Sequence, residues 1–183
     1  MIYGCYPVFI VIGVNAYIVA SPFLFQELLG LSMVNYGKIA ILTGIMVVIG
    51  GAINTQLLNK FSPEQILNNS WILVLISGGT MLVLQLLGIH NVLSLLIPCL
   101  IFFISIPFMA ANSNALSYSY IKSDFGAAGS LVTFVQLFTG FLSTGLMSFF
   151  SETTYYPLAS TIIFCAITGK LTLIIADRID SRN

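Results

Sequence analysis

The chain has 183 residues, of which 58% are hydrophobic and 7% are charged, with a formal net charge of zero and a mean hydropathy of +1.02. An average soluble domain carries about 25% charged residues, so this composition excludes a soluble monomer and predicts an integral membrane protein. The balanced charge and the lack of a basic cluster argue against nucleic acid as a partner.

Six apolar stretches follow one another along the chain, and a membrane-spanning helix needs about 20 mostly apolar residues. The predicted spans are residues 2–23, 37–58, 70–88, 92–117, 126–149 and 156–176. The connections between them read LLGLSMVNYG, NKFSPEQILNNS, GIHN, SYSYIKSDFG and SETTYYP. The sequence therefore predicts an all-α fold in which residues 1–183 form one six-helix transmembrane bundle. The first span begins without a polar flank, which indicates a chain that starts inside a larger protein.

Basic residues lie mainly at one end of the predicted bundle. The basic residues predicted on one side of the membrane are Lys60, Lys122, Lys170, Arg178 and Arg182, and Lys38 is predicted on the other side. By the positive-inside rule, this predicts a multi-pass protein of the inner (plasma) membrane with both termini in the cytoplasm. Trp71 is expected at the cytoplasmic interface, and Tyr155 and Tyr156 at the opposite one.

The titratable and reactive groups do not form the pattern of an enzyme, a metal site or a cofactor site. Cys5, Cys99 and Cys165 each lie in an apolar run and lack the spacing of metal ligands or redox pairs. The acidic residues all fall in connections or near span ends, so no proton-path carboxylate is expected in the middle of a span. Lys170 is expected to extend its amine toward the cytoplasm, with a cavity-facing role as the alternative.

Small and polar residues recur every three or four positions in two of the predicted spans, so each set forms a stripe on one helix face. The fifth span carries Gly126, Gly129, Ser130, Thr133, Gln136, Gly140, Ser143 and Thr144, and the second carries Gly37, Ala40, Gly44, Gly51 and Asn54. Such stripes let helix backbones approach closely in lipid. We therefore predict that Gly44, Gly51, Gly126, Gly129 and Gly140 pack against neighbouring helices.

The fourth span is interrupted by Pro98 and Pro107 and ends in two asparagines, Asn112 and Asn114. Each proline removes a backbone hydrogen bond and tends to kink the helix. The asparagines point about 200° apart on a helix, so they cannot both line one cavity. One is expected to face a water-filled path, and the other to bond a neighbouring helix or to lie near the cytoplasmic interface.

Three segments carry a family resemblance: SPFLFQELLGLSMVNYG (21–37), GGAINTQLLNKF (50–61) and NSNALSYSYIKSDFGAAGSLVTFVQLFTGFLST (112–144). In this order they resemble the loop after the seventh helix, the next cytoplasmic loop, and the tenth and eleventh helices of bicyclomycin-resistance-type drug/proton antiporters. These antiporters are a branch of the major facilitator superfamily. The loop that follows the second segment, LLNKFSPEQIL, departs from the family in having fewer basic residues and Ser62 where glycine is common, which weakens the expectation of tight gating by this loop.

The resemblance implies the C-terminal six-helix half of a twelve-helix multidrug efflux transporter. In the family, the other half carries the antiporter motif and the main proton-coupling carboxylate, so this chain alone is not expected to transport. Its partner would be a separate six-helix half or a second copy of the chain. The alternative is a truncated gene remnant or a non-transporting membrane interaction protein.

The candidates for contact with a substrate are neutral side chains: Asn15, Tyr17, Asn112 and Gln136. Paired transporter halves hold their substrate near the middle of the membrane, and aromatic neighbours such as Phe134 and Phe138 suit an amphiphilic, drug-like ligand. The alternative for each candidate is a hydrogen bond between helices.

Overall fold

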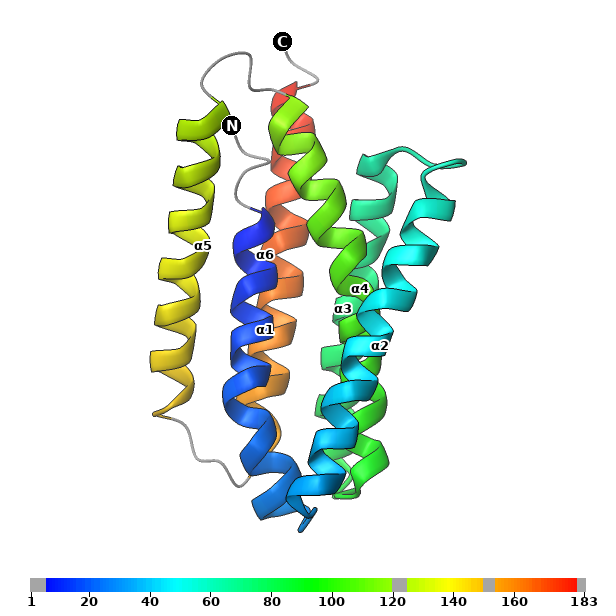
Figure 1. The fold of residues 1–183 in the computed structure, drawn as a ribbon, viewed down its shortest axis with the longest axis vertical. Helices are drawn as coiled ribbons and strands as arrows, with labels where there is room; N and C mark the ends of the chain where they lie inside the picture. Colours follow the sequence, from blue (N-terminus) through cyan, green and yellow to red (C-terminus); the bar gives the residue numbers. More distant parts are fainter. Residues whose placement is uncertain (1–5, 120–124, 150–153, 181–183) are drawn as a thin grey trace.

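A computed structural model of the chain describes residues 6–119, 125–149 and 154–180, and within these ranges the regular secondary structure is helical throughout (Figure 1). The elements are α1 (Tyr6–Pro22), the π-helix η2 (Phe23–Leu28), α2 (Met33–Leu57), α3 (Pro63–Leu86), α4 (Val92–Ser119), α5 (Phe125–Met147) and α6 (Tyr156–Asp180). Residues 2–5 of the first predicted span, Cys5, Lys122 and Arg182 lie outside the described residues.

Within the described residues, six helical segments are long and apolar enough to cross a membrane, with α1 and η2 together forming the first of them. The predicted all-α fold with six membrane spans is therefore confirmed. The physical basis is simple: backbone N–H and C=O groups have no water to bond in lipid, so each apolar stretch must satisfy them within its own helix.

The second and third helices begin earlier than predicted. The Ser32 side chain accepts a hydrogen bond from the backbone N–H of Asn35 and starts α2 at Met33. Ser62 and Gln65 form a reciprocal capping box that starts α3 at Pro63 rather than at residue 70. The predicted connections were too long because their polar residues were assigned to loops, whereas they cap helices and form first turns.

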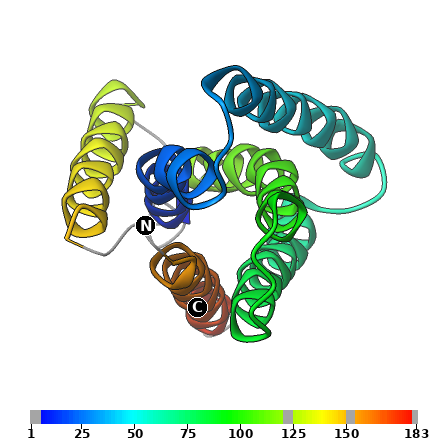
Figure 2. The ribbon, with the colours of Figure 1, turned by 90° about the horizontal axis from the view of Figure 1, so that it is seen from below.

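The helices form a bundle with a well-packed part and two flanking helices. Along the chain, α3 packs on α4 and α6, while α1 packs on α4, α5 and α6. The view along the bundle shows α2 and α5 on its two flanks, with α1 and α4 between them (Figure 2). Helix α2 packs mainly on α4, and α5 mainly on α1.

Trp71 is buried in the core of the bundle and does not face the surrounding membrane, so the belt role predicted for it is wrong. Its side chain is 2% exposed and its ring stands edge-on to Phe9, with centroids 6.4 Å apart. A methyl group added at Gly169 would overlap the indole ring, so α6 has no side chain at the point where the tryptophan packs. Tyr155, predicted for the opposite interface, is also fully buried, whereas Tyr156 is exposed.

The predicted packing glycines differ in what surrounds them. Gly140 is buried against Asn15 and Val11 of α1, as a packing role requires. A Cβ atom added at Gly44, Gly51 or Gly126 would have no described atom within 4 Å. The described helices therefore do not pack against these three glycines. Gly129 is half-buried on α5, and its carbonyl accepts a hydrogen bond from Thr133.

On α2 the buried stripe shares only Asn54 with the predicted one. The residues that α2 buries are Ile39, Thr43, Gly50 and Asn54. A side chain at Gly50 would overlap the backbone of Ile104 on α4, so this glycine marks the closest approach of the two helices. Gly51 is one residue further and therefore points about 100° away. The prediction was right that α2 has a packing stripe, but it placed the stripe on a neighbouring face of the helix.

Candidate functional site

Two of the four candidate residues, Asn15 and Tyr17, lie two positions apart on α1 and therefore point in different directions. Asn15 is half-buried and donates a hydrogen bond of 2.9 Å to the carbonyl of Val11 on its own helix. Its amide also lies against Gly140, so the missing side chain on α5 makes the room that Asn15 occupies. Asn15 is thus part of the α1–α5 contact.

Tyr17 faces α4 instead. Its side chain is 6% exposed, and its ring stands edge-on to Phe103 with centroids 4.7 Å apart. The hydroxyl group is buried and has no hydrogen-bond partner among the described residues. A buried hydroxyl without a well-formed hydrogen bond costs free energy, and the nearby polar groups are the hydroxyls of Ser21 and of Thr43 on α2.

Asn112 forms a hydrogen bond between helices. It is 1% exposed, and its amide donates to the side-chain oxygen of Asn54 on α2 at 2.8 Å and to the carbonyl of Phe108 at 2.6 Å. Of the two roles considered for this asparagine, the structure shows the bond to a neighbouring helix. Asn114 points elsewhere and is half-buried.

Gln136 lies on the side of α5 that faces α1. Two residues further along the same side contact α1: Gly140, one turn later, lies against Asn15, and the Ser143 hydroxyl donates to the carbonyl of Ile12 at 3.0 Å. Gln136 is half-buried, and its side chain has no hydrogen bond to another described residue. A long amide at the edge of a helix contact can turn toward a ligand or a partner helix.

The aromatic residues predicted near Gln136 form a separate feature. Phe134 and Phe138 stack on each other with centroids 6.0 Å apart, and both are more than half exposed. They lie two residues before and after Gln136 and so point about 200° away from it. They belong to the outer face of α5.

The four candidates therefore do not enclose one cavity within this chain. Asn15 and Gln136 lie along the α1–α5 contact, Tyr17 between α1 and α4, and Asn112 between α2 and α4. All are neutral hydrogen-bonding groups, so the arrangement suits recognition of a polar ligand group rather than proton transfer. Among the described residues, no three His, Cys, Asp or Glu side chains come together as metal ligands.

Lys170 joins α6 to α3. Its amine donates to the backbone carbonyl of Asn68 at 3.1 Å and to the side-chain oxygen of the same residue. Asn68 lies near the start of α3, so the amine is directed toward the end of the bundle where Lys60 lies and bonds a neighbouring helix there. Its predicted extension toward the cytoplasm stays a prediction. Sequence reasoning missed Asn68 because it assigned this residue to the connection before the third span, whereas α3 begins at Pro63.

Comparisons of the chain with protein families, with curated proteins and with solved structures gave no match.

Proposed function

We propose that this chain is one six-helix half of a membrane transporter and that a second six-helix bundle packs against its α2 and α5. The observation that carries the proposal is the uneven burial of the spans. In α2 and α5, 17% of the most apolar stretch is buried, compared with 39–44% in the other four spans. These two helices flank the same bundle and are the least covered parts of it.

The small-residue stripes support a protein partner on these helices rather than lipid alone. Gly44 and Gly51 on α2 and Gly126 on α5 have open space where other helices would pack. In lipid there is no hydrophobic drive between helices, and small residues favour association because they allow close packing. A partner bundle, either a separate half or a second copy, would fill these positions.

The resemblance to bicyclomycin-resistance-type antiporters supports multidrug efflux as the activity of the paired halves. The substrate would be an amphiphilic, drug-like molecule held near the middle of the membrane between the bundles. Gln136 and Tyr17 are the residues best suited to contact it, because each has an amide or hydroxyl without a described partner. Asn15 and Asn112 would hold the helices that carry them.

The proposal is tested by reconstitution. The chain is placed in proteoliposomes alone and together with the N-terminal six helices of a bicyclomycin-resistance-type antiporter, and ethidium transport is followed by fluorescence. We expect transport only in the combined vesicles. Gly44→Leu and Gly126→Leu should abolish it, whereas Gly79→Leu on α3, which also has open space around it, should not. Equal effects of all three substitutions would contradict the proposed interface.

The alternative function is that of a gene remnant or a non-transporting membrane interaction protein. The bond between Asn112 and Asn54 favours it, because a buried amide that could face a substrate is already paired within the bundle. The DNA upstream of the gene distinguishes the two. An in-frame or frameshifted six-helix half there identifies a split or broken antiporter, and its absence favours the interaction protein.

A further inference from the structure

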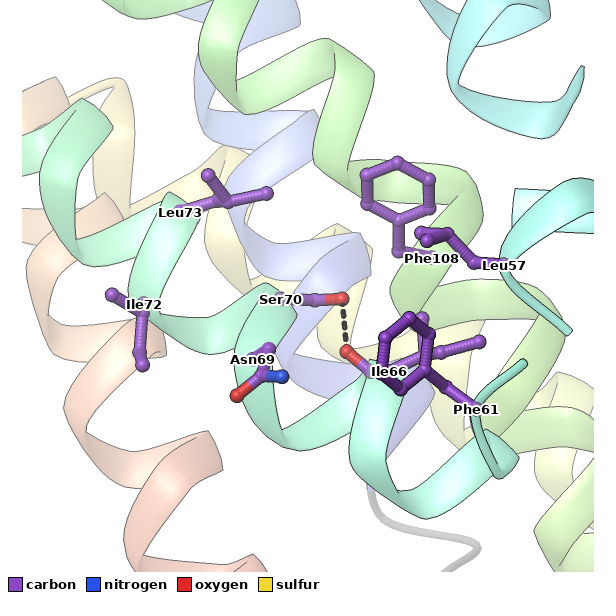
Figure 3. Close-up of a pocket in the computed structure, with 8 residues that line it drawn as sticks. All are labelled: Leu57, Phe61, Ile66, Asn69, Ser70, Ile72, Leu73 and Phe108. Carbon is purple, nitrogen blue, oxygen red and sulfur yellow. Dashed lines mark hydrogen bonds between the residues drawn. The ribbon is translucent and has the colours of Figure 1, made fainter. Parts of the chain in front are cut away.

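A pocket of about 360 Å³ lies at the end of the bundle where the turn between α2 and α3 is found (Figure 3). Both helices pack on α4 but make little contact with each other, so a space remains between them. The lining residues come from α2, the turn, α3 and α4, and are Leu57, Phe61, Ile66, Asn69, Ser70, Ile72, Leu73 and Phe108. None of the four candidate substrate residues is among them.

The pocket opens toward the surroundings of the helices. Phe61 and Ile72 are each 48% exposed, so its rim is not covered by other parts of the described chain. Ser70, the one buried polar group of the lining, donates to the carbonyl of Ile66 at 2.6 Å and has no proton left for a ligand. Because α2 and α3 are long and apolar enough to span a membrane, an open apolar space between them is suited to a lipid chain.

The basic residue nearest in sequence to the lining is Lys60. Lys60 precedes Phe61 in the turn, is exposed, and makes no ion pair with a described residue. Glu64, the one acid nearby in sequence, lies in the first turn of α3 and is not paired with it. Lysines next to a membrane span attract the phosphate groups of anionic lipids.

Asn69 provides a second polar contact deeper along the helix. It lines the pocket, is exposed, and has no hydrogen bond to another described residue. It follows the Ser62 cap of α3 by seven residues, which at 1.5 Å per residue places it about 10 Å from the helix start.

We propose that this pocket binds an anionic phospholipid of the adjacent leaflet. One acyl chain lies between α2 and α3 against Phe61 and Leu73, the amide of Asn69 donates to an ester carbonyl, and Lys60 binds the phosphate. The site is separate from the proposed transport path and does not depend on it.

The test uses the full chain in nanodiscs of phosphatidylcholine that contain a trace of phosphatidylglycerol with a diazirine in its acyl chain. After irradiation, the labelled residues are located by peptide mass spectrometry. We expect labelling to concentrate at the pocket lining, above the level at the lipid-facing residues Ile76 and Val83. Unlabelled phosphatidylglycerol should compete for the pocket and phosphatidylcholine should not.

Matched substitutions then separate the phosphate contact from the acyl-chain contact. Lys60→Gln should lower pocket labelling about fivefold, as the loss of one lysine near an anionic membrane surface implies, while Lys38→Gln at the opposite end leaves it unchanged. Leu73→Trp should fill the pocket and reduce labelling, whereas Leu75→Trp, on the same helix but outside the lining, should not.

Even labelling over all lipid-facing residues would overturn the proposal, because it indicates ordinary surrounding lipid. Equal competition by both lipids, or unchanged labelling in Lys60→Gln, would overturn the phosphate contact and with it the choice of an anionic lipid. The wild-type labelling pattern decides the question even if a variant fails to fold.

Discussion

At the scale of single residues, a buried hydrogen bond between two side-chain amides joins distant parts of the chain. Asn54 and Asn112 are 4% and 1% exposed, respectively, and share a hydrogen bond between α2 and α4. In lipid, such bonds are worth about 0.6 kcal/mol on average and at most about 1.7 kcal/mol. The pair therefore fixes how α2 sits on α4 more than it adds to total stability.

We expect Asn54→Leu and Asn112→Leu each to lower the free energy of unfolding, because each leaves the other amide buried without its partner. The double variant should cost less than the sum of the two, with a coupling of about 0.6 kcal/mol. Unfolding in mixed micelles measures all three variants. Gln56→Leu, at an exposed position of α2, is the control. Strict additivity of the two substitutions would show that the amides do not interact.

Gln136 allows a prediction on ligand contact. It has no described hydrogen bond to lose, so Gln136→Leu should leave abundance and thermal stability unchanged. In a transporter reconstituted from two halves, it should alter the pattern of drugs exported, because a leucine cannot bond a polar group of the substrate. Resistance profiles against several drugs at matched expression provide the measurement. An unchanged profile would remove Gln136 from the substrate site.

At the scale of elements, the glycines show which helix contacts are close. Gly50 lies where α2 meets the backbone of α4, whereas Gly44 on the same helix faces open space. The two residues have the same chemistry, but their surroundings differ. Substituting each with alanine therefore isolates the effect of the helix contact.

We expect Gly50→Ala to destabilise the bundle by about 1–3 kcal/mol, the usual range for overpacking. Gly44→Ala should be neutral or stabilising by up to about 1 kcal/mol, because alanine is the better helix former. Thermal unfolding of the purified chain in detergent compares the two. If both substitutions had the same effect, the close approach of α2 and α4 at Gly50 would be wrong.

At the scale of the whole molecule, the basic residues predict how the bundle lies in the membrane. With both termini in the cytoplasm, a reporter fused after Ser151 should be external and one fused after Asn183 cytoplasmic. A phosphatase reporter, active outside, and a fluorescent protein, active inside, read out each position. The same location for both fusion points would exclude the topology with both termini in the cytoplasm.

The distribution of acids leads to a prediction about activity. Within the described residues, Glu27 lies at the end of the first span and Glu64 in the first turn of α3, while Asp177 and Asp180 follow the last span, so no carboxylate is near the middle of a span. Proton-coupled transport needs an ionisable group on the path. Vesicles that contain this chain alone should therefore show no dye transport in response to a pH gradient. A response that an uncoupler abolishes would contradict this.

The helix content and the number of spans could be predicted from the sequence, because in lipid the length of an apolar stretch decides both. The starts of α2 and α3 could also have been predicted, because Ser32 and Ser62 are typical helix-capping residues. The prediction assigned them to loops instead. For the candidate site, the sequence identified the polar residues inside spans, including Asn54 and Asn112, but not which of them meet.

Only the tertiary structure decided which helix face is covered. A shift of one residue turns a helix by about 100°, and apolar side chains surround these helices on every side, so composition does not mark the buried face. This is why Gly50 rather than Gly51 lies against α4, and why Trp71 fills the space above Gly169 instead of facing the surrounding membrane. In a membrane, lipid and protein interior are equally apolar, so close packing between particular side chains determines which face of a helix is buried.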